Sequence, residues 1–271
     1  MGMDDPFEKV SWMRPPELGG WEYLIAHRSR RLWTVYHESY DLCACARWSH
    51  YWRYRGRIHT LTGPGMMMLE PGELHRTLSV PPEAAFKVAL IPVSAVEAAA
   101  TEFGAHGAIH LARAETADPD LTNAVWRLGE AIERADVEAL ELQTMQAMVL
   151  RRLFDHAERS PRINPRIDEA IAVNRARDYL LDRLHEPVSL DELTAAAGLG
   201  RFQLLRAFSR HFGVPPHAFQ LHLRIERGRE LLRRGAPAGL VAIEVGFCDQ
   251  SHFTRHFKKI TGVTPGEYAG R

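Results

Sequence analysis

The sequence VAIEVGFCDQSHFTRHFK, residues 241–258, decides the fold of the C-terminal part of this chain. Residues 241–245 predict a short helix, and residues 246–248, beginning with glycine, predict the turn that ends it. Asp249 is a suitable N-cap for a second helix over residues 250–261. A short helix, a turn of three residues and a second helix together form the helix-turn-helix motif.

An internal repeat places a second copy of this motif 49 residues earlier in the chain. Five identities and one aromatic exchange share this offset: Arg206, Phe208, Gly213, Val214, Pro216 and Phe219 correspond to Arg255, Phe257, Gly262, Val263, Pro265 and Tyr268. In the earlier copy Ser189 and Glu192 form a capping box, residues 198–200 end the helix, and residues 201–212 form the next one. Residues 217–234 predict a long helix between two copies of one supersecondary unit.

Residues 241–258, followed by Gly262-Val263-Thr264-Pro265, resemble the signature of the AraC/XylS family of bacterial transcription regulators. The resemblance covers residues 167–271. It implies a DNA-binding domain with helix-turn-helix units at about 188–212 and 238–261, joined by a long helix.

The resemblance also implies which side chains contact DNA. Carried over by motif position, they are Arg201, Phe202, Leu205 and Arg206 in the first unit and Gln250, Ser251, His252 and Arg255 in the second. Outward arginine and glutamine suit this role, because arginine pairs with guanine and glutamine with adenine in the major groove. His252 fits a base contact, a phosphate contact or a cap. Gly200 stands where the family commonly has serine, a change that costs a helix only a few tenths of a kcal/mol.

The first 116 residues are predicted to form short strands separated by turns. The predicted strands are 32–36, 40–48, 51–61 and 86–91, with turns at 63–65 and 71–72. Short strands at this spacing favour an antiparallel sandwich or barrel. Residues 65–75 are similar to the strand-turn-strand of the cupin-like domain in many members of the family. That similarity implies a domain that binds a small-molecule effector and helps to form a dimer.

Helical periodicity begins at about residue 117. Asp118 is a predicted N-cap, and residues 117–160 are predicted to form a helical pair that contributes to dimerisation. Residues 161–166 contain two prolines and predict a linker. We therefore expect an α+β protein of two domains, with an antiparallel β-barrel or sandwich and its helices in residues 1–160 and an all-α domain in residues 167–271.

The predicted barrel contains candidate ligand-binding residues. Tyr36, Trp48 and Trp52 are candidates for an apolar effector pocket with polar groups. His37, His59 and His75 raise the hypothesis of a metal, but a closely spaced His-x-His pair is lacking, so no metal, no cofactor and no catalytic residue is predicted. Cys43 and Cys45 are interpreted as small core residues.

The overall charge hides an asymmetry between the two ends of the chain. The 34 basic residues balance 34 acidic ones, yet residues 201–271 hold twelve basic and five acidic residues, a net charge of +7 against −7 for the remainder. A basic C-terminal segment suits a phosphate backbone. Three cysteines and no run of roughly 20 apolar residues predict a cytoplasmic protein that does not span a membrane.

The predicted function is regulation of transcription through sequence-specific binding of double-stranded DNA. The expected partners are DNA and a second copy of the chain, with a small-molecule effector and a contact with RNA polymerase as further hypotheses. Two alternatives stay open: a metal-dependent cupin enzyme with an attached DNA-binding module, and an effector-independent regulator whose N-terminal domain only dimerises.

Overall fold

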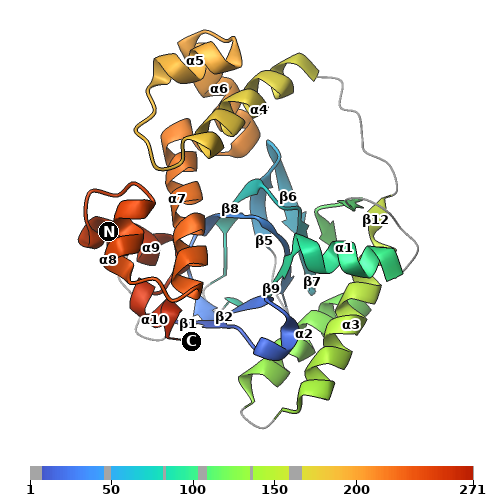
Figure 1. The fold of residues 1–271 in the computed structure, drawn as a ribbon. Coiled ribbons are helices and arrows are strands. Elements are labelled where there is room, and N and C mark those ends of the chain that lie inside the picture. The colour runs from blue at the N-terminus through green and yellow to red at the C-terminus, as the bar shows by residue number, and fades with distance from the viewer. Residues whose placement is uncertain are drawn as a thin grey trace.

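The computed structural model of the 271-residue chain describes residues 8–45, 50–81, 84–102, 109–134, 137–158 and 167–270. Two antiparallel sheets lie at its centre, with one group of helices on either side (Figure 1). This arrangement confirms the predicted fold class. The predicted linker, residues 161–166, lies outside the described residues. Among the described helices, none combines the length and the apolar character that a membrane-spanning helix requires.

The first sheet has six strands, all paired antiparallel. In spatial order they are β1 (Lys9–Met13), β2 (Glu22–Ser29), β9 (Ala84–Pro92), β4 (Ser39–Cys45), β7 (Gly65–Leu69) and β11 (Glu115–Thr116). The second sheet has the order β3 (Thr34–His37), β8 (Glu73–Ser79), β5 (His50–Tyr54) and β6 (Arg57–Leu61). The two sheets enclose a shared core and are together called the barrel here.

The predicted single strand over residues 51–61 is a hairpin, and this correction has a local cause. Arg55 and Gly56 both have positive φ, 48° and 71°, which allows a tight turn between β5 and β6. Glycine at the second position was the signal that could have located the turn.

Strand β4 separates two cores because side chains alternate across a strand. Tyr40, Leu42 and Ala44 belong to the core under the N-terminal helices. Cys43 and Cys45 belong instead to the core between the two sheets, as expected for small core residues. Asp41 shares their register and is buried there as well.

Three helices cover the outer face of the first sheet (Figure 1). Helix α1, within the segment expected to be strands alone, was not predicted, and it begins directly after β9. The elements around this face are η1 (Pro16–Leu18), α1 (Val93–Glu102), β10 (His110–Leu111), α2 (Pro119–Glu133), α3 (Ala139–Asp155) and β12 (Ala157–Glu158).

Asp118 accepts hydrogen bonds from the amides of Asp120 and Leu121, which confirms the predicted N-cap of α2. Strand β12 pairs with β10 in a separate two-stranded sheet, which joins the end of α3 to the segment that precedes α2.

The C-terminal part is entirely helical. Its helices are α4 (Ile167–Asp182), α5 (Leu190–Ala197), α6 (Arg201–Phe212), α7 (Pro216–Arg233), α8 (Ala238–Glu244), α9 (Gln250–Thr261) and α10 (Pro265–Ala269). The capping box of Ser189 and Glu192 is present at the start of α5, and Asp249 caps α9, as predicted.

The barrel and the C-terminal helices share a continuous core. Trp12, Trp33 and Phe86 of the barrel pack in the same cluster as Phe253 and Phe257 of α9. A side chain at Gly262 would meet Trp33 at 3.0 Å and Val10 at 3.2 Å, so the end of α9 lies directly against the barrel. Burial of apolar surface on both sides holds the two parts together.

Candidate nucleic-acid interface

The first helix-turn-helix unit consists of α5, a glycine turn and α6. Gly198 ends α5 in the left-handed conformation, with φ of 68°, and Gly200 occupies the N-cap of α6 without a side-chain hydrogen bond. Leu204 and Phe208 are buried against the rest of the unit. The amphipathic pattern therefore presents one face of α6 to solvent.

The four DNA-contact candidates of α6 differ in their surroundings. Arg201 and Arg206 are exposed and Leu205 is half-buried, whereas the side chain of Phe202 lies outside the described part. The Nε of Arg201 donates to Asp191 at 2.8 Å. Both partners are more than half exposed, and such surface pairs stabilise proteins by at most about 1 kcal/mol, so the pair leaves Arg201 able to exchange partners.

The second unit consists of α8, its turn and α9. The amide of His252 donates to the Asp249 carboxylate at 2.7 Å, which fixes the start of α9. Phe253 and Phe257 are buried, whereas Gln250, Ser251 and Arg255 are exposed. By the 49-residue offset of the repeat, these three exposed side chains correspond to the DNA-contact candidates of α6.

His252 differs from its neighbours because its ring has partners within the protein. Its Nδ1 lies 3.1 Å from the Cys248 thiol, and its ring packs edge-on against Phe247 with centroids 5.2 Å apart. These contacts favour a role for the His252 ring in packing against the turn over a contact with a DNA base.

Arg206 and Arg255 occupy equivalent positions in the two units. Within the described residues neither forms a hydrogen bond or an ion pair, and both are exposed. Lys259 is also exposed on α9. These side chains have the positive charge and the exposure that a contact with a phosphate or a base edge requires.

Arg224 of α7 ties the turn of the second unit to the segment that precedes the first unit, a role that its sequence position did not reveal. Its guanidinium donates to the carbonyl oxygens of Leu184 at 2.7 Å and Glu186 at 2.9 Å, which lie between α4 and α5. It also donates to the carbonyl of Gly246, in the turn of the second unit, at 2.7 Å. A planar guanidinium with several fixed donors suits such a joint.

Gly246 is required at this joint by close packing. Its φ is 82°, and a Cβ there would lie only 2.5 Å from the carbonyl oxygen of His185. The turn glycine therefore allows the second unit to approach the segment that precedes the first.

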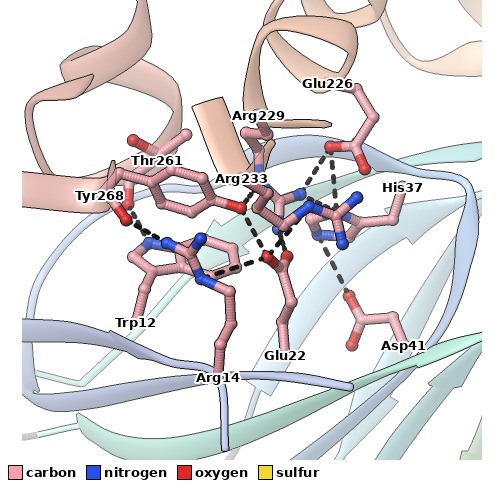
Figure 2. Close-up of polar contacts among 10 residues, drawn as sticks. All are labelled: Trp12, Arg14, Glu22, His37, Asp41, Glu226, Arg229, Arg233, Thr261 and Tyr268. Atoms are coloured by element: carbon pink, nitrogen blue, oxygen red, sulfur yellow. Dashed lines mark hydrogen bonds and ion pairs between the residues drawn. The ribbon is translucent and has the colours of Figure 1, made fainter. Parts of the chain in front are cut away.

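Arg229, further along α7 than Arg224, connects the helix to the barrel (Figure 2). It is 3% exposed and pairs with Glu22 of β2 and with Glu226 at 2.5 Å. Its guanidinium carbon lies 4.2 Å from the centre of the Trp12 ring. Glu22 also accepts a hydrogen bond from the Tyr268 hydroxyl at 2.6 Å, which brings α10 into the same network.

The network continues from Arg229 into the barrel through His37. Arg229 donates to His37 Nδ1 at 3.0 Å, and His37 Nε2 lies 3.7 Å from the Asp41 carboxylate (Figure 2). Because a guanidinium can only donate, Nδ1 accepts and the ring proton lies on Nε2. A protonated Nε2 has no lone pair for a metal, and no metal-binding group of three His, Cys, Asp or Glu side chains occurs among the described residues.

The structure separates the three candidate effector residues. Tyr36 is buried against Phe219 of α7, with ring centroids 5.5 Å apart, and so belongs to the contact with the C-terminal helices. Trp52 is buried between the sheets and stacks on His59 at 5.4 Å. Trp48 lies outside the described residues. A cavity between the sheets is lined by other residues, including Trp12, Trp33, Asp41, His75, Phe86 and Val88.

Two helix-turn-helix units on one long helix define the class of the C-terminal domain. Residues 193–271 match the family described as helix-turn-helix domain. Together with the matched relatives, this confirms the resemblance drawn from residues 241–258: the chain carries a helix-turn-helix domain of the AraC type.

The relatives matched over this region are transcriptional regulators. MtrA of Neisseria gonorrhoeae is 38% identical over 90 residues, which are 33% of this chain and 30% of MtrA. LumQ of Photobacterium leiognathi is 30% identical over 92 residues, or 34% of this chain and 37% of LumQ. The chain thus spans about a third of the length of these curated relatives.

Solved structures of ToxT from Vibrio cholerae align with the chain over both of its parts. A ToxT variant from Vibrio cholerae, in its apo form, aligns over 92% of this chain and 97% of its own, with a TM-score of 0.53 and 14% identity. At this identity the likeness concerns the fold alone, and it matches the order of a β-rich part followed by helices.

Proposed function

We propose that this protein is a sequence-specific DNA-binding transcription regulator. The observation that carries the proposal is the equivalent exposure of Arg206 and Arg255 on α6 and α9, which belong to two units connected by the long helix α7. With one rigid helix between them, the two units suit adjacent segments of one major-groove face. Arginines set affinity through phosphates, and the outward residues of α6 and α9 read bases.

Selection of bound fragments from genomic DNA, followed by footprinting, tests this proposal. We expect Arg206→Ala and Arg255→Ala each to weaken binding by about 1–3 kcal/mol and to relax base preference at different positions of the site. Arg127→Ala, an exposed arginine of α2, is the matched control and leaves the footprint unchanged. If both variants give the same footprint as the wild type, these two arginines are not part of the DNA interface.

We further propose that the barrel is an effector domain and acts on DNA binding through α7. Its support is the path from Asp41 through His37 to Arg229, which joins the barrel cavity to the helix that holds both units. A ligand that binds one arrangement of this path better than another would shift the population of DNA-binding states. Such a regulator carries out no catalysis and acts in the cytoplasm, where bacterial DNA lies.

A second copy of the chain is the proposed partner at α3. Leu140 and Met148 of this helix are 73% and 58% exposed, although both are large and apolar. They lie eight residues apart, so they share one helix face. Burial of this face in a homodimer would remove it from water.

A further inference from the structure

The barrel cavity combines an aromatic wall with a single buried carboxylate. Trp12, Trp33 and Phe86 contribute aromatic rings, and Asp41 contributes the carboxylate from β4. Asp41 is 4% exposed, at a register position where β4 otherwise carries small core residues. A buried polar group is informative, because burial is unfavourable unless the group finds partners.

Asp41 lacks a strong partner of its own. Its Oδ1 has no hydrogen-bond partner in the described structure, and its Oδ2 lies 3.7 Å from His37 Nε2 and 3.8 Å from His75 Nε2. Burial holds the pKa of His75 well below its usual value, so this ring is neutral. The His37 ring is already engaged, because its Nδ1 accepts a hydrogen bond from Arg229 at 3.0 Å.

Arg229, whose positive charge lowers the pKa of Asp41, is already paired with other carboxylates. Arg229 pairs with Glu22 and Glu226, and although burial would raise the pKa of Glu226, Arg229 holds it down at about 2. Burial raises the pKa of Asp41 to about 6, against the smaller lowering effects of His37 and Arg229. Among the described residues, the Asp41 carboxylate therefore has no hydrogen bond to Oδ1 and no charged partner closer than 3.7 Å.

A second polar atom in the cavity wall is also without a partner. The indole Nε1 of Trp33 forms no hydrogen bond within the described part of the chain, although the residue is 8% exposed. Because the indole N–H can only donate, Asp41 Oδ1 is the acceptor that a ligand with a donor group would meet beside these aromatic rings.

We propose that the barrel cavity binds a small organic ammonium ion. Its N–H group donates to the Asp41 carboxylate, and its carbon atoms pack against Trp12, Trp33 and Phe86. A cation compensates the buried charge and is attracted to the faces of aromatic rings. An anion would be repelled by Asp41, and a neutral molecule would leave its charge unpaired. The inference rests on the proposed role of the barrel as an effector domain and names its ligand class.

The size of the cavity limits the ligand. Its volume is about 50 Å³, and one water-sized group needs about 10–15 Å³ on this measure. There is room for roughly three to five non-hydrogen atoms. Propylammonium, with three carbons and one nitrogen, is therefore a suitable probe.

Titration calorimetry of the full chain with three probes of similar size tests the ligand class. The probes are propylammonium, 1-propanol and propionate. We expect propylammonium to bind the wild type at one site and at least about tenfold more tightly than the other two, because a hydrogen bond between charged groups is roughly twice as strong as one between neutral groups. Asp41→Asn is expected to weaken propylammonium binding by at least about tenfold and to leave 1-propanol binding unchanged.

Asp182→Asn makes the same chemical change at an exposed carboxylate of α4 and serves as the matched control. Equal binding of 1-propanol or propionate, full affinity in Asp41→Asn, or no saturable binding of propylammonium would each overturn the proposal. Circular dichroism of Asp41→Asn shows whether the variant is folded.

DNA binding is measured on the same preparations by fluorescence anisotropy. If the protein binds DNA but not propylammonium, the proposed ligand class is wrong and the proposed regulator function still stands. Propylammonium binding without DNA binding contradicts the proposed regulator and leaves the ligand class supported.

Discussion

Arg229 on α7 donates a hydrogen bond to His37 on β3 at 3.0 Å, across 192 positions of the sequence. The same guanidinium pairs with Glu22 on β2 and with Glu226 on its own helix. One buried arginine therefore touches two barrel strands and the helix that joins the two DNA-binding units. Its removal should affect the stability of the whole chain.

The first prediction concerns this buried arginine. Arg229→Met should lower the free energy of unfolding by about 3–5 kcal/mol, because it leaves buried carboxylates without their cation. Urea denaturation measures the loss. Arg233→Met is the control on the same helix; Arg233 lies 3.6 Å from Glu22 but is 36% exposed, so its loss should stay below about 1 kcal/mol. Equal losses in the two variants would contradict the importance of the buried network.

The second prediction concerns the joint made by Arg224. Arg224→Lys removes the planar fork that reaches three carbonyl oxygens, so the two units should lose their fixed relative orientation. Binding to a site that spans both units should weaken by about tenfold, while binding to either half-site stays near the wild-type value. Anisotropy titrations with full and half sites measure the difference. An equal change on all three DNAs would argue for a direct contact instead.

The third prediction separates phosphate contacts from base contacts. Lys259 is exposed on α9, and Lys259→Ala should weaken binding equally for all DNA sequences. The slope of log affinity against log salt should fall by about 1, because one fewer counterion is released. Lys9→Ala, at an exposed position of β1, is expected to leave the slope unchanged. A sequence-dependent effect of Lys259→Ala would place this residue at a base edge.

The fourth prediction follows from the raised pKa of Asp41, about 6. Its folded pKa lies above the unfolded value near 3.9, so the folded state retains the proton longer and stability falls as pH rises from about 4 to 6. Above pH 6 the ionised form opposes folding by about 3 kcal/mol.

Asp41→Asn should therefore raise the unfolding free energy at pH 7.5 by up to this amount and have little effect near pH 4. The groups that face Asp41 are His37, His75, Cys45 and Arg229, and all four remain in the variant. Thermal denaturation of the variant across this range checks the sign. A stability loss at pH 7.5 would show that the ionised carboxylate is well compensated.

The fifth prediction concerns the dimer proposed at α3. Leu140→Ser and Met148→Ser together should shift the protein toward the monomer, because they remove the exposed apolar face. Light scattering after size-exclusion chromatography gives the mass. Ile58→Ser alters an exposed apolar residue of β6, 60% exposed, and should leave the mass unchanged. A wild-type protein that is monomeric at high concentration would contradict the proposal.

The sequence by itself determined the helix-turn-helix units. Ser189 with Glu192, Asp249 and the turn glycines act within three or four residues of their own position, so short-range patterns locate these helix ends. The repeat then identified Arg206 and Arg255 as equivalent, and both are exposed in the structure.

Only the tertiary structure decided which polar residues are buried together. Arg229 and Arg224 have the spacing of ordinary helix-surface arginines, and nothing near them in the sequence shows that their partners are Glu22 or the carbonyl of Gly246. In the sequence, Asp41 is likewise a single acidic residue in a predicted strand. Only the fold shows that its carboxylate is buried and that His37 and His75 of the facing sheet are its neighbours. Helix caps are encoded locally, whereas burial and electrostatic compensation depend on segments that meet only after the chain has folded.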